Sequence, residues 1–378
     1  MSMFHELMMR KKEEIMYATI KETLTENNGV FSGFSASNYL ALQEPFAPTG
    51  SWEVCFKVKF GSNVSLAKYF FGSTSYGIVL GNTDTPSGAF KVFLSSNGIS
   101  WDIGILSTGI NNPADSIRYV KIGFTGEKYY IEQSEDGITY IGRAELNSTK
   151  KIYSVPVRIG NSYEPSNRYW QGAIDLNNSY IKLGSTKYNL QAVVGYTVVG
   201  SPTITDGVVS GFTTSDYLTL PRTSNLANQY EIKAKLKITQ NSSSYMAILL
   251  SFYNWGKQGI KIKADTLSAN LRYIYNETTT DKDIRLQYNF QENVDYYIKY
   301  VYKNNEFYIG VSEDDINYVY SQKETIPSGV TLVQLDNSGV GSLSIGRTYQ
   351  YSAFQGEIDL NETYIKINNK LWFNGQQA

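Results

Sequence analysis

The 378-residue sequence predicts an all-β protein, in which one N-terminal α-helix precedes two tandem β-sandwiches. Three observations favour this fold class. Four sequence blocks recur in the same order at a nearly constant spacing. Short runs of residues alternate between apolar and polar. The composition includes 31 tyrosines and 31 glycines, which is typical of strands and the turns between them. A chain of this length also exceeds what one hydrophobic core usually fills.

The repeat is clearest in a twelve-residue block near the end of each copy. Residues 172–183 read GAIDLNNSYIKL and residues 356–367 read GEIDLNETYIKI, with eight identical positions. Three earlier blocks recur with a shift of 178 residues, and they begin at Gly33 and Gly211, at Trp52 and Tyr230, and at Ser134 and Ser312. Because order and spacing are shared, the sequence indicates a tandem duplication with one domain in each copy.

Residues 1–26 differ from the rest of the chain and predict an α-helix. Met, Leu, Ile, Lys and Glu dominate, Gly and Pro are absent, and Asn27-Asn28-Gly29 is a helix stop signal. The apolar residues lie on two sides of a helical wheel, with Phe4, Leu7, Met8 and Ile15 on one side and Met9, Met16, Ile20 and Leu24 roughly opposite. A helix with two apolar sides needs more than one partner surface. We therefore expect it to anchor the protein or to form an oligomer. The alternative is a frayed helix docked on the first domain.

The first domain is expected over residues 29–190, a linker over 191–206 and the second domain over 207–374. In residues 52–60, apolar and aromatic side chains alternate with Glu53, Lys57 and Lys59, and residues 230–238 alternate in the same way. Strands of this kind belong to antiparallel sheets with one solvated face. We therefore interpret the outward Lys233, Lys235 and Lys237, the lysine row, as solvated. Hairpins are predicted at 119–133 and 297–311.

Charge and rare residues exclude several kinds of function. Lys and Arg total 34 and Asp and Glu total 35, which is not the basic excess of a nucleic-acid-binding protein. The single cysteine, Cys55, and the single histidine, His5, exclude a disulfide framework, multi-cysteine metal sites and histidine catalysis inside the domains. No apolar run approaches the ~20 residues of a membrane span, and no signal peptide is visible. We expect no cofactor, no metal, no membrane partner and synthesis in the cytoplasm.

The recurring blocks resemble those of a known domain family. Their order is Gly-Phe-x-x-Ser-x-Tyr-Leu-x-Leu, a strand opened by Trp/Tyr-Glu, Ser-Glu-Asp-x-Ile-x-Tyr, and Gln-Gly-x-Ile-Asp-Leu-Asn-x-x-Tyr-Ile-Lys. This order is similar to tandem concanavalin A-like, laminin-G-like jelly-roll domains in structural proteins of tailed bacteriophages. The resemblance covers residues 29–374. It implies a non-enzymatic virion protein (a fibre, decoration or collar component), made in the host cytoplasm. Its helix would contact other virion proteins and further copies of itself.

Two alternatives stay open. One is a stand-alone carbohydrate-binding protein. The other is a laminarinase-like retaining glycoside hydrolase, because Glu357-Ile-Asp359-Leu-Asn-Glu362 matches the motif of such enzymes. By that resemblance Glu357 would be the nucleophile, Asp359 a helper and Glu362 the acid/base. The first copy has Ala173 and Asn178 in place of the two glutamates, which weighs against catalysis. The aspartate common to both copies is interpreted as capping its own bend.

Aromatic residues in loops are the candidate glycan-binding residues. Pyranose C–H faces stack on aromatic rings while polar neighbours bond the hydroxyls. The candidates are Tyr163, Tyr169, Tyr349, Tyr351, Trp101 and Trp255. Trp170 and Phe354 occupy the same position before Gln-Gly in the two copies, and we expect both in the cores.

Overall fold

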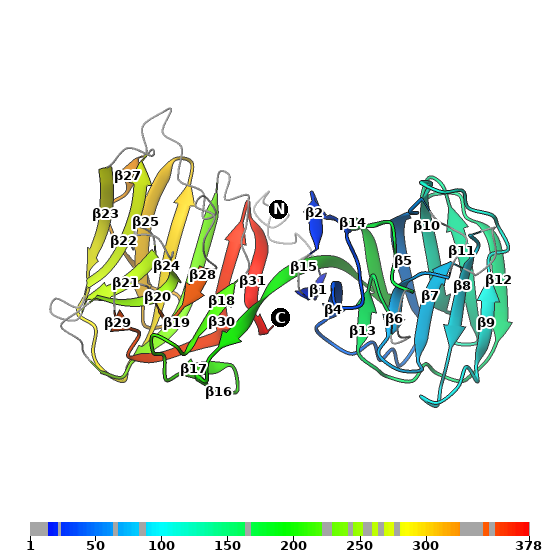
Figure 1. Cartoon of the computed structure of the whole chain (residues 1–378), viewed down its shortest axis with the longest axis horizontal. Coiled ribbons are helices and arrows are strands. Elements are labelled where there is room, and N and C mark those ends of the chain that lie inside the picture. Colours follow the sequence, from blue (N-terminus) through cyan, green and yellow to red (C-terminus); the bar gives the residue numbers. More distant parts are fainter. Residues whose placement is uncertain are drawn as a thin grey trace, which may run out of the picture. The chain divides into compact units, whose positions relative to one another are not determined.

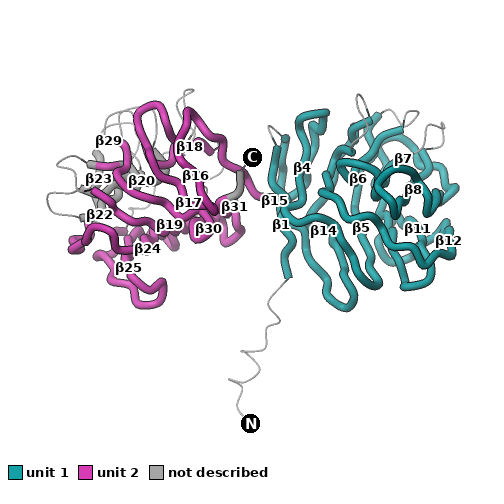
Figure 2. The backbone as a smooth tube through the Cα atoms, turned by 90° about the horizontal axis from the view of Figure 1, so that it is seen from below, with its two compact units in different colours: residues 1–192 teal, residues 193–378 magenta. Residues whose placement is uncertain are grey.

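The computed structural model describes residues 14–21, 24–62, 67–82, 88–162, 168–220, 229–240, 245–251, 259–263, 268–275, 280–325, 343–347 and 352–377. Within these ranges the protein is all β, with 31 strands and no helix. The chain divides into two compact units, residues 1–192 (unit 1) and residues 193–378 (unit 2), which Figure 2 colours separately. This all-β architecture agrees with the jelly-roll sandwiches that the resemblance implies.

Unit 1 is a sandwich of two antiparallel sheets (Figure 1). Sheet I has the strand order β2 (Thr25–Asn27), β3 (Val30–Ser32), β14 (Ala173–Leu183), β5 (Trp52–Lys59), β10 (Ile117–Phe124), β11 (Lys128–Ser134) and β12 (Ile141–Asn147). Sheet II has the order β1 (Glu14–Lys21), β4 (Tyr39–Leu42), β13 (Val157–Ile159), β6 (Tyr69–Ser73), β7 (Ile78–Asn82), β8 (Phe90–Leu94) and β9 (Gly104–Ser107). The predicted hairpin at 119–133 is β10–β11.

Unit 2 repeats this topology. Its sheet I has the order β16 (Thr203–Thr205), β17 (Val208–Ser210), β30 (Gly356–Ile367), β19 (Tyr230–Ile238), β24 (Asp295–Lys303) and β25 (Glu306–Ser312), followed by β26 (Val319–Tyr320) and β27 (Glu324–Thr325). Its sheet II has the order β15 (Thr186–Val199), β18 (Tyr217–Leu220), β28 (Leu343–Ile345), β20 (Tyr245–Ser251), β21 (Gly259–Lys263), β22 (Ser268–Tyr275) and β23 (Thr280–Gln287). Strand β29 (Ser352–Ala353) pairs with β20, and β31 (Lys370–Gln377) pairs with β30 and β15. The equivalent strand orders confirm the duplication.

The predicted N-terminal helix is wrong over residues 14–21, which form β1. Thr19 of β1 pairs with Ala41 of β4, and the equivalent pair in unit 2 lies 178 residues later in β15 and β18. Residues 14–21 are therefore the first strand of a sandwich. Their β-branched and aromatic residues suit the pairing that β4 offers, and this pairing outweighs local helix propensity.

The predicted anchoring residues consequently have another role. Ile15, Met16 and Ile20 lie in β1, and Leu24 lies just before β2. Met16, Ile20 and Leu24 pack against the core of unit 1. Phe4, Leu7 and Met8 lie outside the described residues.

The predicted linker, residues 191–206, is also mostly strand. Strand β15 extends to Val199, and β16 covers Thr203–Thr205. The β16–β17 pairing repeats the β2–β3 pairing with the same shift of 178 residues, from Thr25↔Ser32 to Thr203↔Ser210. The duplicated segments therefore begin earlier than residues 29 and 207.

The core of unit 1 lies between its sheets and is rich in aromatic residues. Phe56 and Phe70 are fully buried, and Trp170 is 2% exposed. The Trp170 ring lies 5.1 Å from the rings of Phe60 and Phe70, and its Nε1–H donates to the carbonyl of Lys59 at 3.1 Å. Burial of Trp170, and of Phe354 in unit 2 at 1% exposure, confirms both core predictions.

Candidate functional site

The outer face of sheet II in unit 1 carries a row of aromatic side chains. In β7 and β8, one set of alternate residues faces the main core and the other set faces outward. The Tyr69 ring lies 6.3 Å from the Phe93 ring, the Phe93 ring 5.6 Å from that of Trp101, and the Trp101 ring 4.8 Å from that of Tyr76. We refer to Tyr69, Tyr76, Phe93 and Trp101 as the aromatic row.

A glycine positions one end of the row. A Cβ atom added at Gly81 would lie 2.0 Å from the carbonyl oxygen of Lys68 and 2.7 Å from Cδ1 of Tyr69. Glycine at this position therefore lets the Tyr69 ring lie close against the sheet.

A tight turn positions the other end of the row. The backbone N–H groups of Ile99 and Ser100 donate to Oδ1 of Asn97 at 2.8 and 3.0 Å. Trp101 follows, and the next carboxylate, Asp102, accepts from the Ser96 N–H at 2.7 Å and from Lys150 at 2.8 Å. These bonds fix the backbone on both sides of the Trp101 side chain.

The row presents a partly exposed apolar surface with polar groups near its ends. Tyr69 is 3% exposed, whereas Tyr76, Phe93 and Trp101 are partly exposed. Ile105, which is 52% exposed, is the cross-strand partner of Phe93 and continues the apolar surface onto β9. Arg168 donates to the hydroxyl of Tyr69 at 3.0 Å. Aromatic faces flanked by a guanidinium and a carboxylate can stack a sugar ring and bond its hydroxyls.

The structure brings two of the predicted glycan-binding residues to this row. Trp101 is part of it, and Tyr169 forms a β-bridge with Tyr69. The Nζ atom of Lys68 lies 5.4 Å from the centre of the Tyr169 ring. The other four predicted residues, Tyr163, Tyr349, Tyr351 and Trp255, lie outside the described residues.

Sequence reasoning missed Tyr69, Tyr76 and Phe93. The sequence does contain a signal for Phe93. Buried and partly exposed residues alternate over 90–94, and this alternation places Phe93 at an outward position. An outward aromatic residue on a strand is a candidate ligand contact as much as an aromatic residue in a loop.

The outer face of sheet I carries a different, polar network that both units share. In unit 1, Glu53 accepts hydrogen bonds from the hydroxyls of Tyr130 and Tyr180, each at 2.5 Å. In unit 2, Glu231 accepts from Tyr364. Burial acts to raise the pKa of Glu53, but the two hydrogen bonds and two nearby lysines outweigh it, so its pKa is lowered. Burial and the bond to Glu53 raise the pKa of both tyrosines.

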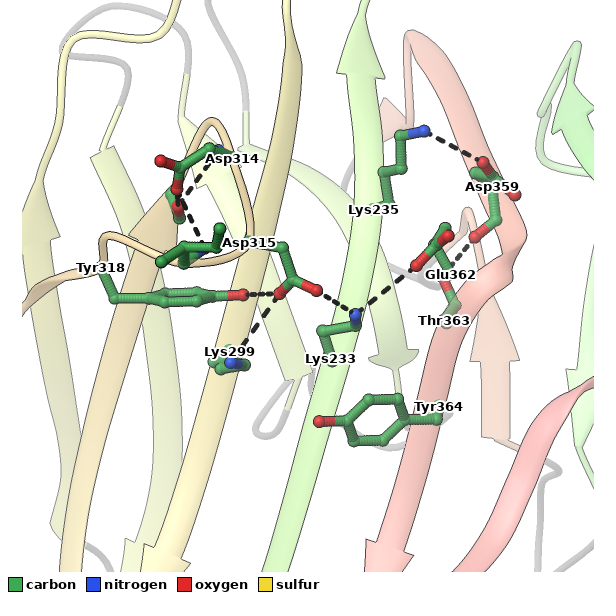
Figure 3. Close-up of polar contacts among 12 residues, drawn as sticks. Lys233, Lys235, Lys299, Asp314, Asp315, Tyr318, Asp359, Glu362, Thr363 and Tyr364 are labelled. Carbon is green, nitrogen blue, oxygen red and sulfur yellow. Dashed lines mark hydrogen bonds and ion pairs between the residues drawn. The ribbon is translucent and has the colours of Figure 1, made fainter.

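In unit 2 the lysine row pairs with the glucanase-like carboxylates, and Figure 3 shows the pairs of Lys235 with Asp359 and of Lys233 with Glu362. The ion pairs, with N–O distances of 3.3 to 3.6 Å, are Lys237–Glu357, Lys235–Asp359 and Lys233–Glu362. Lys233 also lies 2.7 Å from Asp315. It is only 7% exposed, so the prediction of a solvated lysine is wrong at this position. The cause is the turn after β25, which carries Asp315 over the sheet.

The block shared by the two copies has a structural role. Asp359 accepts a hydrogen bond from the N–H of Asn361 at 3.0 Å, and Asp175 accepts from the N–H of Asn178 at 3.3 Å. These bonds agree with the predicted capping role of the aspartate, but the predicted bend between two strands is a register shift within one continuous strand, β14 or β30. Asp175 also pairs with Lys57 at 3.1 Å, as Asp359 pairs with Lys235. Unit 1 thus keeps the aspartate cap and the ion pair without either glutamate. This supports a structural role for the shared block and weighs against a catalytic one.

The described residues contain no group of three or more His, Cys, Asp or Glu side chains that could hold a metal ion. In the same part of the chain, no helix is long and apolar enough to cross a membrane. Cys55 is 2% exposed, and its sulfur lies 3.7 Å from the hydroxyl of Tyr140.

Comparison with known proteins gives weak structural similarities. No protein-family model and no curated protein matches the sequence. Domains LG4-5 of the mouse laminin alpha1 chain are 10% identical, with 98% of this chain and 99% of that chain covered and a TM-score of 0.31. The carbohydrate-binding module CBM66 from Bacillus subtilis is 12% identical, with 44% and 92% covered and a TM-score of 0.28. Trypanosoma rangeli sialidase in complex with sialic acid is 8% identical, with 80% and 58% covered and a TM-score of 0.34. At these values the similarities carry no argument about function.

Proposed function

We propose that this chain is a non-catalytic glycan-binding protein and that the aromatic row of unit 1 is its binding surface. The observation that supports this function best is the position of Trp101. Its ring is partly exposed on the outside of a sheet, beside the rings of Tyr76 and Phe93. Such a surface suits the apolar face of a pyranose, and Arg168 and Asp102 would meet hydroxyls at its ends.

Rigid aromatic side chains on a sheet lose little conformational entropy when a ligand stacks on them. The Trp101 backbone is fixed by the turn at Asn97, so the surface is formed before the ligand arrives. The row is a shallow face, so we expect modest affinity, with a Kd on the order of micromolar to millimolar.

A glycan array with the full chain tests this function. Trp101→Ala should raise the Kd of any array ligand by roughly fivefold to thirtyfold, because a lost stacking contact corresponds to about 1–2 kcal/mol. Ile138→Ala is the matched control, since Ile138 is an 83% exposed apolar residue at a turn of the same kind. No array ligand, or equal binding by Trp101→Ala and the wild type, would contradict the proposal.

We further propose that the chain is a structural component of a tailed-phage particle, such as a fibre, decoration or collar protein. The resemblance of the repeated blocks supports this setting, as do two tandem sandwiches of equal topology. Glu14–Lys21 and Thr25–Asn27 are strands, so we propose residues 1–13 as the anchoring segment. Electron microscopy and light scattering of the wild type and a variant lacking residues 2–13 test this role. If both proteins are monomers, self-association through that segment is contradicted. Symmetric multimers of the wild type would favour a particle component over a stand-alone binding protein.

A further inference from the structure

A second aromatic surface lies in unit 2, on sheet I instead of sheet II. It consists of Tyr308 from β25, Tyr318 from the following turn and Tyr320 from β26, and we refer to these residues as the tyrosine ladder. The Tyr318 and Tyr320 rings are stacked, with centroids 5.7 Å apart and planes 23° apart. The Tyr308 ring meets that of Tyr320 edge to face at 5.5 Å. Tyr320 is 50% exposed, so the ladder opens to solvent.

One glycine makes room for the ladder. A Cβ atom added at Gly310 would lie 2.5 Å from Cε1 of Tyr320 and 3.0 Å from Cδ1 of Tyr318. Both rings therefore lie over a position that has no side chain. Gly310 is also the direct cross-strand partner of Tyr320. Its φ is outside the positive region, so the backbone itself does not require glycine.

Unit 1 shows what the fold needs at the same positions. The residues equivalent to 308, 310, 318 and 320 are Tyr130, Glu132, Tyr140 and Gly142. In unit 1 the Arg143 guanidinium lies 4.3 Å from the Tyr130 ring and bonds to Glu132 at 2.9 Å. An ion pair thus covers the first tyrosine in unit 1.

The two copies therefore differ by paired changes at neighbouring positions. Unit 2 has Gly310 where unit 1 has Glu132, and it has Tyr320 where unit 1 has Gly142, so a ring lies over the position that the ion pair occupies in unit 1. Lys323 lies 5.4 Å from the centre of the Tyr308 ring. Because unit 1 folds into the same sheet without the ladder, folding alone does not require it. Tyr320 is half exposed and the rings of Tyr308 and Tyr318 are partly exposed, so the ladder presents aromatic surface to solvent that a ligand could cover.

The charges beside the ladder are matched, which indicates the class of ligand. Lys323 pairs with Glu306 at 2.8 Å, and Lys299 lies 3.9 Å from the centre of the Tyr318 ring and 3.8 Å from Asp315. Figure 3 shows Tyr318, Lys299 and Asp315 side by side. These groups can bond hydroxyls, but they do not favour a ligand of one sign of charge.

We propose that the tyrosine ladder is a second saccharide site and that it binds neutral pyranosides. The ligand class rests on the proposed glycan-binding function. The site itself is separate, because the ladder lies on sheet I of unit 2 and the aromatic row lies on sheet II of unit 1.

The test uses the full chain and native mass spectrometry with maltohexaose, cellohexaose, laminarihexaose and mannohexaose as probes. At saturation we expect two bound hexaoses in the wild type and one in Tyr320→Ala. Gly310→Glu restores the unit 1 residue and should also bind one, as should Trp101→Ala. Ile138→Ala is the control, because Ile138 is 83% exposed and lies outside both the aromatic row and the ladder, and it should retain two. Melting temperatures establish that each variant is folded.

The outcomes separate the two proposals. If Trp101→Ala abolishes all binding and Tyr320→Ala and Gly310→Glu change nothing, the ladder is overturned and the aromatic row stands. If binding survives in Trp101→Ala and is lost in both ladder variants, the ladder stands without the row. Binding of none of the four hexaoses overturns the ladder as a site for neutral pyranosides.

Discussion

The Glu53→Gln substitution should lower the free energy of unfolding of unit 1 by about 2 kcal/mol. The Glu53 carboxylate accepts two hydrogen bonds of 2.5 Å, from Tyr130 and Tyr180. A hydrogen bond to a charged group contributes about 1.5–3 kcal/mol and a neutral one about 1 kcal/mol. Glutamine keeps the length and one acceptor oxygen, but it presents an amide NH₂ to the second hydroxyl. About half of the stabilisation should therefore remain.

Differential scanning calorimetry of the full chain measures this change. For a unit of this size, 1 kcal/mol corresponds to about 2–4 °C, so the unit 1 transition should move down by about 4–8 °C. Glu231→Gln, the equivalent change, should lower the unit 2 transition and so assign the two transitions. Glu127→Gln, at an exposed turn, is the control and should change stability by less than about 0.5 kcal/mol.

Double-mutant cycles show whether the hydrogen bonds cause the effect. Tyr130→Phe and Tyr180→Phe should each cost less in the Glu53→Gln background than in the wild type. A melting shift below about 1 °C for Glu53→Gln, or losses that simply add in the double variants, would refute the reasoning.

Three further predictions concern stability. Backbone N–H groups of Thr139 and Ile138 hold the pKa of Asp136 at about 2, so its stabilisation is complete above about pH 4 and is lost as the pH falls towards 2. Urea midpoints should fall over that window, and less so in Asp136→Asn. Phe70→Ala removes a fully buried ring and should lower the free energy of unfolding, measured by urea denaturation, by about 3–5 kcal/mol. Phe70→Leu leaves a smaller cavity and should lower it by less. Gly81→Ala adds a Cβ 2.0 Å from a backbone carbonyl, so it should lower the melting temperature and weaken glycan binding together.

The sandwich strands could be predicted because their side-chain pattern reports burial directly. In residues 52–60, the inward positions Trp52, Val54, Phe56, Val58 and Phe60 are at most 4% exposed. Cys55 faces outward from the core in the same strand, yet it is 2% exposed and its sulfur lies 3.7 Å from the hydroxyl of Tyr140. A period of two separates the two sides of a strand, but it does not say which loops fold over the outer side.

Residues 14–21 show the opposite case. Their composition favours a helix, and no local signal outweighs it, because the partner strand β4 begins 18 residues after β1 ends. The internal repeat held the missing information. Thr19 aligns with Thr197 at the same shift of 178 residues, and residues 193–199 read VVGYTVV, a β-branched composition that favours a strand in both copies. Of the aromatic row, only Trp101 was predicted from the sequence. Its ring contacts join residues from several strands and a turn, and a local pattern does not contain such contacts.

Strand β15 determines how the protein can be dissected. Residues 186–189 pair with β14 of unit 1, and residues 197–199 pair with β18 of unit 2. Domain boundaries usually fall in exposed, irregular segments, where proteases cut. Here an extended, hydrogen-bonded strand occupies that place, so limited digestion should spare residues 186–199 and cleave elsewhere first. A cut between residues 186 and 199 would therefore remove an edge strand from one of the two sandwiches.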